Sequence, residues 1–374
     1  MPRTALVLTG GGARAAYQVG LLRAVARRFP DWQCDLFCGV SAGAINATYL
    51  AVRAGHFGAA TEELCDLWTG LTPASVFDPQ LGITLRSAAR LLKRFLPWRT
   101  RPPQRSAEGL VDTAPLRRLL GEALGALPDG SIPALRANLE AGLLHALSLT
   151  TIDWATGRSV TWVDAKEIEL WRRPSRESRR SHVTVDHVLA SSALPFLFPA
   201  VEIGDSWHGD GGVRLVYPLA PAVHMGADRI LAVSTRYRPP GERDPDTVGY
   251  PPPAQLAGVL MNAVFLDQLD QDAERLREIN LLLRGAVDEE TQLRPIDLVF
   301  IRPSRDLGRL AGEFEPELPA SMRTVLRGLG TRQTASPDIL SMIMFQRDYV
   351  ERLIEIGEAD AEKHAGELEM LLGG

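Results

Sequence analysis

Two strand-turn-helix units follow one another within the first fifty residues, and their order constrains the fold of this chain more than any other feature. Residues 4–8 read as a short apolar strand, residues 10–12 as a glycine turn, and residues 15–29 have the apolar spacing of a helix. Residues 36–54 repeat the same order. Strands that alternate with helices predict an α/β fold with a mainly parallel sheet, covered by helices on both faces.

The composition is that of a globular protein with a substantial core. The chain has 374 residues, of which 45% are hydrophobic and 23% charged, and this excludes a disordered, collagen-like or disulfide-stapled chain. A net charge of −5 argues against nucleic-acid binding, because affinity for phosphate backbones comes mainly from clustered Lys and Arg. Cys34, Cys38 and Cys65 are odd in number and stand among apolar residues, so we expect reduced core thiols.

The sequence contains no apolar run that approaches the roughly 18 residues of a membrane-spanning helix. The short apolar run after Arg3 ends at Thr9 and three glycines. We therefore expect neither a signal peptide nor an anchor helix. The expected location is the cytoplasm, with peripheral contact to a membrane permitted.

The turn of the second unit, Gly39-Val40-Ser41-Ala42-Gly43, has the form G-x-S-x-G. In a nucleophile elbow of this form, the glycines permit a sharp strand-to-helix turn and the serine hydroxyl is presented at the top of the sheet. An apolar strand precedes the motif and a helix with small residues follows it, as an elbow requires. Ser41 is therefore the candidate nucleophile; the alternative is that it only caps the following helix.

The turn of the first unit, Gly10-Gly11-Gly12-Ala13-Arg14, stands in the equivalent position. Its glycines let the backbone approach a ligand closely, and amides at the start of a helix attract a phosphate or a developing oxyanion. A P-loop is excluded because no Gly-Lys-Ser/Thr follows, and a dinucleotide loop is disfavoured because Ala15 stands where its third glycine would be.

A serine nucleophile needs a proton acceptor, and the chain offers either histidine or aspartate. The aspartate is Asp210, within His208-Gly209-Asp210-Gly211-Gly212, a loop whose glycines can bring the carboxylate close to another backbone. A buried aspartate with a raised pKa can act directly as a general base; the alternative is an ordinary Asp-Gly turn. The histidines stand in no obvious motif: His56, His145, His182, His187, His208, His224 and His364.

The later elements are predicted from the same patterns. Strands are expected at residues 143–151, 159–163, 230–234 and 296–301, helices at 116–124 and 185–193, a loop at 207–213, and one long amphipathic helical stretch at 338–364. Thr113 is the expected N-cap of the first of these helices, with Pro115 in its first turn.

The three motifs together resemble those of the patatin-like phospholipase family, in particular its bacterial members. Further stretches agree in order and spacing: residues 112–116, residues 190–195 with Phe198-Pro199, and Asp210-Gly211-Gly212 followed by Pro218. The resemblance covers residues 4–235. The sequence departs from the family at Ala15, where many members have glycine, and at Ala200, where many have a second proline. Ala15 removes no amide from the glycine-rich loop.

The resemblance implies a three-layer α/β/α fold and a serine lipid acyl hydrolase of phospholipase A or lysophospholipase type. It implies Ser41 as nucleophile, Asp210 as its base and an acyl-serine intermediate. The amides of Gly10, Gly11 and Gly12 would form the oxyanion hole. The supporting residues would be Arg14, Gly39, Gly43, Gly211 and Gly212. The sequence shows no ligand spacing typical of a metal site, so we expect no metal or other cofactor.

The domain organisation follows from the extent of the motifs. Residues 1–235 are expected to form the catalytic core, interrupted by a basic insertion near residues 71–109. Residues 236–374 are expected to complete or cover the same domain. Within the insertion, residues 86–105 contain seven cations, no acid and interleaved apolar side chains, a pattern that favours contact with anionic lipid. The alternative is a solvated face of a packed helix.

Two further surface features have simpler interpretations. The arginine-rich residues 172–180 are expected to form a mobile surface loop. The apolar face of residues 338–364 is expected to pack on the core, or alternatively against another chain. The oligomeric state stays open.

The sequence also allows functions other than lipid acyl hydrolysis. An α/β-hydrolase with Ser-Asp-His order, using His224 or His364, would need several strands before its elbow, and this chain has one strand-helix unit before Ser41. A non-catalytic, lipid-binding regulatory module would retain the fold without turnover. The expected substrate is a phospholipid or another acyl ester or thioester, and no nucleic acid is expected as a partner.

Overall fold

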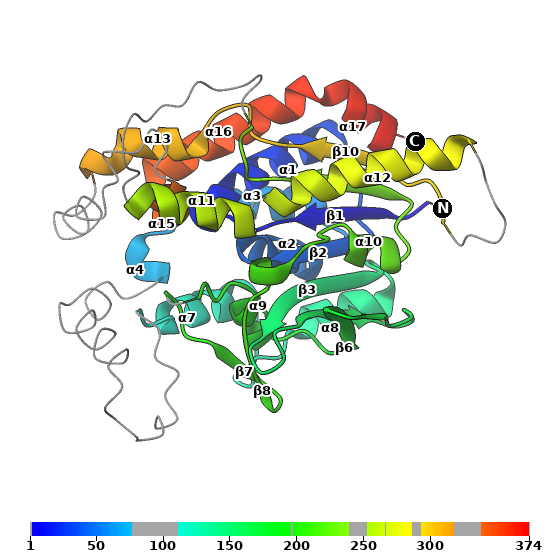
Figure 1. Ribbon diagram of the computed structural model, residues 1–374, viewed down its shortest axis with the longest axis horizontal. Coiled ribbons are helices and arrows are strands. Elements are labelled where there is room, and N and C mark those ends of the chain that lie inside the picture. Colours follow the sequence, from blue (N-terminus) through cyan, green and yellow to red (C-terminus); the bar gives the residue numbers. More distant parts are fainter. Residues whose placement is uncertain are drawn as a thin grey trace.

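A central mixed sheet organises the computed structural model (Figure 1). Its strand order is β10-β9-β1-β2-β3-β4-β6-β5, with β8 also paired to β3 and β7 paired to β8. The structure describes residues 2–76, 111–195, 197–238, 253–265, 267–285, 293–317 and 338–373. The basic segment 86–105 lies outside these residues.

Five neighbouring strands are parallel, and they form the centre of the sheet. Their bounds are Thr4–Leu8 for β1, Leu36–Val40 for β2, Ala146–Asp153 for β3, Arg229–Val233 for β9 and Asp297–Ile301 for β10. Strands β4 and β8 pair antiparallel with β3, β6 pairs parallel with β4, and β5 and β7 pair antiparallel with β6 and β8. Their bounds are Ser159–Ala165 for β4, Arg172–Arg173 for β5, Arg176–Arg180 for β6, Val201–Ile203 for β7 and Ser206–Asp210 for β8.

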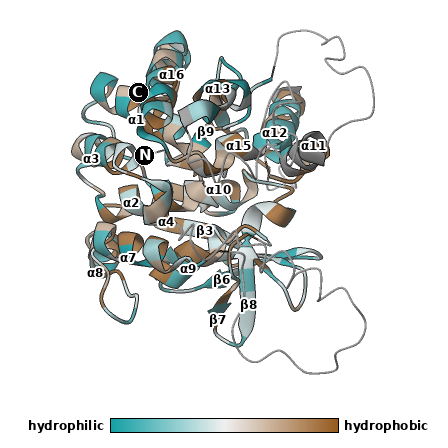
Figure 2. Ribbon diagram, turned by 90° about the vertical axis from the view of Figure 1, so that its left-hand side faces the viewer, coloured by the Kyte–Doolittle hydropathy of each residue, from teal (hydrophilic) through white to brown (hydrophobic). Residues whose placement is uncertain are grey.

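Strand β1 is buried on both faces, which explains its unbroken apolar sequence. Leu6 and Leu8 belong to the larger core cluster, whereas Ala5 and Val7 belong to a second cluster on the opposite face. Successive side chains of a strand point to opposite faces, so this alternation requires a helical layer on each side. The structure has both layers (Figure 2).

Helices on the face of the larger cluster come from both ends of the chain. They are Ala16–Arg28 (α1), Ala42–Val52 (α2), Phe57–Thr69 (α3), Ala114–Ala123 (α7), Pro133–Ala141 (α8), Val185–Ser191 (α9), Leu307–Phe314 (α13), Arg347–Lys363 (α16) and Ala365–Leu372 (α17). The opposite face carries Ala220–His224 (α10) and Asp267–Gly285 (α12). The predicted three-layer α/β/α fold is therefore confirmed.

The remaining elements complete the described part of the chain. They are Gly12–Ala15 (η1), Pro73–Val76 (α4), Gly211–Arg214 (η2), Pro253–Phe265 (α11), Glu315–Glu317 (η3) and Asp338–Ile343 (α15). Within the described residues, no helix is long and apolar enough to cross a membrane. Cys34, Cys38 and Cys65 are free and buried, as predicted.

The C-terminal helix α16 packs directly on α1 through small residues. A Cβ atom added to Gly20 would lie 2.1 Å from the Ile354 carbonyl oxygen, and one added to Gly357 would lie 2.2 Å from that of Tyr17. The Tyr17 hydroxyl also hydrogen-bonds to Asp360 Oδ2 at 3.2 Å. The apolar face of this C-terminal stretch therefore packs against the first helix of the chain.

Three predictions about local structure are wrong. Residues 207–213, predicted as a loop, form the end of β8 and η2, because pairing with β3 and β7 supplies hydrogen bonds that the local sequence does not signal. Residues 172–180, predicted as a mobile loop, form the β5–β6 hairpin. The helical stretch 338–364 is broken at residues 344–346.

The start of α7 differs from the prediction in one detail. Thr113 stands at the N-cap position but, within the described chain, its side chain makes no capping hydrogen bond. The Asp112 carboxylate accepts a 2.9 Å bond from the Ala114 amide instead. Pro115 lies in the first turn as expected.

Candidate active site

Ser41 lies at the sharp turn between β2 and α2. Its backbone has φ 57° and ψ −134°, and it is the one non-glycine residue with positive φ in the described part of the chain. Such a conformation costs about 1–3 kcal/mol and persists only where surrounding packing enforces it. The Ser41 side chain makes no capping hydrogen bond to the described residues of α2. The interpretation of Ser41 as a mere helix cap is therefore wrong.

The two glycines of the elbow allow the backbones around Ser41 to touch. A Cβ atom on Gly39 would lie 2.6 Å from Ala44 Cα, and one on Gly43 would lie 2.2 Å from the Leu8 carbonyl oxygen. Real Cβ atoms do not approach backbone atoms this closely. Both positions thus require glycine for close packing, and the elbow is fixed against β1.

Ser191, in α9, fixes the elbow from the opposite side. Its hydroxyl accepts a 3.1 Å hydrogen bond from the Ser41 amide and donates a 2.7 Å bond to the Thr150 carbonyl. Ser191 is fully buried. No local pattern in the sequence marks Ser191 for this role, since residues 190–195 show only a likeness to the family.

Asp210 is brought to Ser41 by strand β3. The last residue of β2, Val40, pairs with Thr150, and Asp210, the last residue of β8, pairs with Thr151. Strand β4 occupies the other edge of β3, so β2 and β8 lie on the same edge and their carboxyl ends meet. The sheet register therefore places Ser41 and Asp210 at one point.

The backbone after Asp210 leaves no room for side chains. A Cβ atom on Gly211 would lie 2.2 Å from the Thr150 carbonyl oxygen, and one on Gly212 would lie 2.5 Å from the Phe265 ring. The Gly212 amide donates a 2.8 Å hydrogen bond to Asp210 Oδ1. Oδ1 thus stabilises an Asp-Gly turn, as the alternative interpretation of this loop predicted. Oδ2 takes no part in that turn.

The Asp210 carboxyl group is fully buried, and burial raises its pKa to about 7. The Ser41 side chain and the Gly212 amide act in the opposite direction and lower this pKa. Oδ2 is buried and accepts no hydrogen bond of normal geometry from the described residues. The Ser41 side chain therefore lies near the Asp210 carboxyl group, and hydrogen bonds between catalytic groups are often long until a substrate binds.

The glycine-rich loop lies directly over Ser41. A Cβ atom on Gly10 would lie 2.5 Å from Ser41 Cβ and 2.9 Å from its Oγ. The hydroxyl of Thr235, which lies two residues beyond the end of β9, donates a 2.6 Å bond to the Gly10 carbonyl. Gly11 and Gly12 have φ of 147° and 56°, which disfavours other residues. Within the described chain, the amides of these three glycines donate no backbone hydrogen bond.

Arg14, the basic residue of this loop, does not face a solvent-filled site. Its Nε donates a 2.6 Å hydrogen bond to Ser341 Oγ, and its Nη2 forms an ion pair with Asp338. The guanidinium is buried. Residues of the late helix α15 thus contact the site, and no motif or spacing in the sequence marks them for it.

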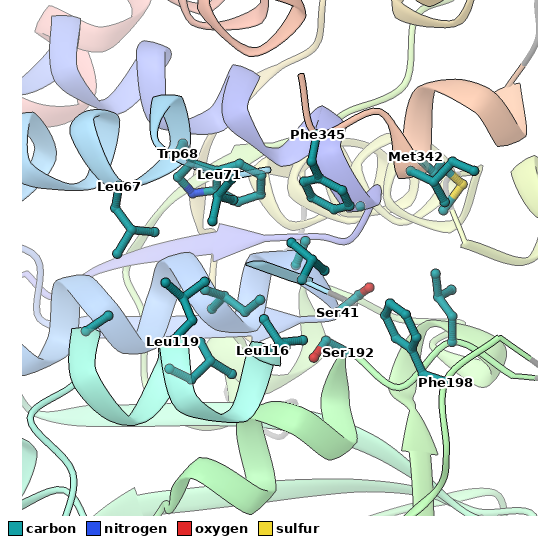
Figure 3. Close-up of a pocket in the computed structure, with 18 of the residues that line it drawn as sticks. Ser41, Leu67, Trp68, Leu71, Leu116, Leu119, Ser192, Phe198, Met342 and Phe345 are labelled. Carbon is teal, nitrogen blue, oxygen red and sulfur yellow. The ribbon is translucent and has the colours of Figure 1, made fainter. Parts of the chain in front are cut away.

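An apolar cavity of about 60 Å³ opens beside Ser41 (Figure 3). In Figure 3, labelled side chains of α3 and α7 lie on one side of Ser41 and Phe198 lies on the other. The apolar lining comes from distant parts of the chain: Ile45, Tyr49, Leu67, Trp68, Leu71, Val76, Leu116, Leu119, Leu120, Leu124, Leu194, Leu197, Phe198, Met342, Ile343 and Phe345. Such a cavity favours a hydrocarbon chain over a polar ligand.

The histidines have other partners. His224 stacks on Trp171 with ring centroids 4.6 Å apart, and His364 hydrogen-bonds to Glu367 at 2.8 Å. His208 is buried and hydrogen-bonds to Thr151 at 3.1 Å. Within the described residues, no hydrogen bond or ion pair joins one of these histidines to Ser41 or Asp210. The geometry therefore does not support a Ser-Asp-His site.

The described residues contain no group of three or more His, Cys, Asp or Glu side chains arranged to hold a metal ion. What the site does contain is a serine, a buried carboxyl group, unused loop amides and an apolar cavity. These are the components of acyl transfer from an ester with an apolar acyl chain.

Comparison with known proteins gives a family match over more than half of the chain. The sequence profile of the family described as Patatin-like phospholipase matches residues 6–223. A search of curated protein sequences found no match.

Three solved structures illustrate the similarities in structure. Human GIVD cytosolic phospholipase A2 has a TM-score of 0.47 and 14% identity, covering 100% of this chain and 60% of its own. VipD from Legionella pneumophila has a TM-score of 0.38 and 14% identity, covering 95% of this chain and 67% of its own. ExoU, in its complex with SpcU from the type III secretion system of Pseudomonas aeruginosa, has a TM-score of 0.29 and 15% identity, covering 95% and 52%. This chain therefore spans only about half to two thirds of their lengths.

Proposed function

The chain belongs to the patatin-like phospholipase family, and on that premise we propose that it is a serine lipid acyl hydrolase of phospholipase A or lysophospholipase type. The observation that carries the proposal is the pairing of Ser41 with Asp210. Ser41 occupies a strained elbow, and the buried Asp210 carboxyl group beside it has one unpartnered oxygen and a pKa of about 7.

The first half of the reaction acylates Ser41. Asp210 Oδ2 takes the hydroxyl proton as Oγ attacks the ester carbonyl carbon, and the carbonyl electron pair moves onto its oxygen. The tetrahedral intermediate collapses when the bond to the leaving alcohol breaks, and Asp210 returns the proton to that alcohol. A pKa of about 7 suits both steps, because the group can accept a proton and donate it near neutral pH.

The second half regenerates the enzyme. A water molecule gives a proton to Asp210 and attacks the acyl carbon, and the bond to Ser41 Oγ breaks as the proton returns to Oγ. The product is a free fatty acid. In both halves the amides of Gly10, Gly11 and Gly12 would donate to the oxyanion, the contribution that is usually largest in acyl transfer. Their position over Ser41 and their lack of backbone partners in the described chain support this assignment.

A lipid acyl chain is the substrate group that best fits the cavity. The cavity beside Ser41 is lined almost entirely by apolar side chains, and each buried methylene contributes about 0.8 kcal/mol of binding. Other acyl esters and thioesters could use the same two side chains. A panel of esters that differ in head group and chain length therefore separates phospholipids and lysophospholipids from these alternatives.

A non-catalytic lipid-binding module is the competing function. It would need the cavity, but it would need neither a strained serine nor a buried carboxyl group with a raised pKa. Both features are unfavourable for stability. Their presence together favours catalysis.

Labelling and hydrolysis of the wild-type protein and two variants test the proposed function. A fluorophosphonate should label the wild-type protein at Ser41, and ester hydrolysis should be lost in Ser41→Ala and fall by about 10²- to 10⁴-fold in Asp210→Asn. Ser192→Ala is the matched control, because Ser192 lines the same cavity outside the elbow. Undiminished hydrolysis in Ser41→Ala would rule out the assignment.

We also propose that the enzyme works at a membrane surface from the cytoplasmic side. The basis is the sequence of residues 86–105, whose cations and apolar side chains alternate without an acid. Replacing Arg86, Arg90, Lys93 and Arg94 by serine should reduce sedimentation with vesicles that contain anionic lipid. Equal sedimentation with neutral and anionic vesicles would contradict this part of the proposal.

A further inference from the structure

Asp338 in α15 lies far outside the residues that match the family, 6–223, yet it contacts the glycine-rich loop through Arg14 and α11 through Asn262. These contacts lead to the two loops on which the proposed chemistry depends. A role for Asp338 in that same site rests on the proposed function.

The first connection leads to the glycine-rich loop. Asp338 Oδ1 forms an ion pair with Arg14, whose Nη2 also donates a 3.2 Å hydrogen bond to the Asp338 carbonyl. Arg14 Nε donates to Ser341 Oγ, and Ser341 in turn donates a 2.6 Å bond to the Asp338 carbonyl. Arg14 is 3% exposed and Asp338 16%. Together these bonds fix the guanidinium to the first turn of α15.

The backbone of the loop is in contact with the same helix. A Cβ atom on Gly12 would lie 2.1 Å from the Met342 carbonyl oxygen. No residue larger than glycine fits this contact without a shift of one backbone. The position of α15 therefore sets the position of Gly12, one of the three proposed oxyanion donors.

The second connection leads to the loop of the proposed base. Asp338 Oδ2 accepts a 2.7 Å hydrogen bond from Asn262 in α11. Phe265, at the end of the same helix, packs on Gly212, since a Cβ atom there would lie 2.5 Å from its ring. Gly212 donates its amide to Asp210. Both carboxylate oxygens of Asp338 are thus used, one toward each loop.

We propose that Asp338 is a positioning residue that holds the oxyanion loop and the Asp210 loop in their productive arrangement. Acyl transfer is sensitive to small displacements, and a misplacement of about 1 Å can lower a rate by about 10²-fold. A buried ion pair is a poor device for stability alone, because an apolar pair of similar volume is often at least as stable. The directional hydrogen bonds of the Arg14–Asp338 pair are instead suited to holding the two loops in a fixed orientation.

Asp338→Asn tests this role while keeping the side-chain volume. We expect kcat to fall by about 10- to 100-fold, with KM for a short soluble ester changed less than about threefold. The midpoint of the pH profile should stay near 7, because Asp210 remains buried as in the wild-type protein. General loss of structure would instead expose Asp210 and move that midpoint down.

Hydrogen exchange tests the positioning role without turnover. In Asp338→Asn we expect faster exchange in peptides that cover residues 9–16 and 208–216, with the central strands unchanged. This readout also separates the two proposals: if wild-type protein hydrolyses no ester, the proposed function fails, and the exchange result still decides whether Asp338 fixes the loops. Unchanged exchange in both peptides overturns the inference.

Two further variants complete the test. Glu351→Gln removes the partner of Arg347 in an exposed ion pair on α16 and should alter neither kcat nor exchange. Arg14→Met combined with Asp338→Leu removes both buried charges and avoids an uncompensated one, so it is informative even if Asp338→Asn does not fold. A kcat that stays about 10-fold or more below wild type in this double variant supports positioning; full wild-type kcat overturns it.

Discussion

Val40 and Asp210 lie end to end along one edge of strand β3, paired to its neighbouring residues Thr150 and Thr151. The proposed nucleophile follows the first of them and the proposed base is the second. Their separation is therefore set by one step along a strand buried in the middle of the sheet. A strand is a stiff reference for such a pair, and catalytic groups on regular elements are held more accurately than groups on loops.

The rate of ester hydrolysis should depend on pH through Asp210. Its pKa is about 7, and the base must be deprotonated to accept the serine proton. We expect kcat/KM for an uncharged ester to rise about tenfold per pH unit below pH 6 and to level off above pH 8. Ser192→Ala should show the same profile, and a flat profile between pH 5 and 8 would contradict the assignment of the base.

The same raised pKa predicts that stability falls as pH rises, whereas activity increases. The folded pKa of Asp210 lies above the ordinary carboxyl value, so between these two pH values the folded state binds more protons than the unfolded state. Its contribution to stability is present at low pH and is lost as pH rises through 7, by at most about 4 kcal/mol. The unfolding free energy of Asp210→Asn, relative to that of wild type, should therefore be higher at pH 8 than at pH 5. Urea unfolding at both pH values measures this difference.

A methyl group at position 10 should block the site. The added Cβ of Gly10→Ala would lie 2.9 Å from Ser41 Oγ, so we expect kcat to fall by at least about 10²-fold. Gly121→Ala in α7 is the matched control, because a Cβ there meets nothing within 4 Å. The control should keep full activity and gain about 0.5–1 kcal/mol of stability. Equal activity of the two variants would show that the loop does not lie over the serine.

Removal of the Ser191 hydroxyl should loosen the elbow. Ser191→Ala leaves the Ser41 amide and the Thr150 carbonyl without this partner, and we expect a loss of roughly 1–3 kcal/mol in unfolding free energy together with a lower kcat. Ser192→Ala should cost less, because its hydroxyl bonds to carbonyls of its own helix turn. Urea unfolding and ester hydrolysis of both variants test the difference; similar losses in both would contradict it.

Phe345 should limit the length of the acyl chain. It lines the cavity beside Ser41 and also an adjoining open groove of about 490 Å³. Phe345→Ala should join the two spaces and raise the kcat/KM ratio of long over short esters by about tenfold, the effect of burying two more methylenes.

Phe314→Ala is the control for that variant. Phe314 packs edge to face on Tyr349 and does not line the cavity. It should lose stability without a change in chain-length preference. A ratio that is unaltered in Phe345→Ala would show that this ring does not end the cavity.

The sequence was sufficient for the central layers of the fold. The unit around Ser41 combines an apolar strand, two glycines and a helix of small residues, and each of these is a local signal. The order of strands and helices then determines a parallel sheet. Strand β8 was missed because Ser206–Asp210 has neither alternation nor β-branched residues, and its pairing with β3 is a long-range event.

The candidate site was predictable only where a residue type carries its own local pattern. Ser41, Asp210 and the glycine loop stand in such patterns, and their catalytic roles stay predictions. Ser191, Thr235 and Asp338 act through hydrogen bonds to backbone or side-chain atoms that are distant in the sequence. No periodicity or spacing marks a serine, threonine or aspartate for such a bond, so only the folded chain reveals them.

The strained backbone of Ser41 has a consequence for the history of this protein. Glycine would adopt the same φ and ψ without the cost of about 1–3 kcal/mol, so a lineage that no longer used the hydroxyl would gain stability by exchanging serine for glycine at this position. Serine at position 41 therefore carries a cost in stability that glycine would not, and the proposed role of its hydroxyl is a reason for that cost to persist.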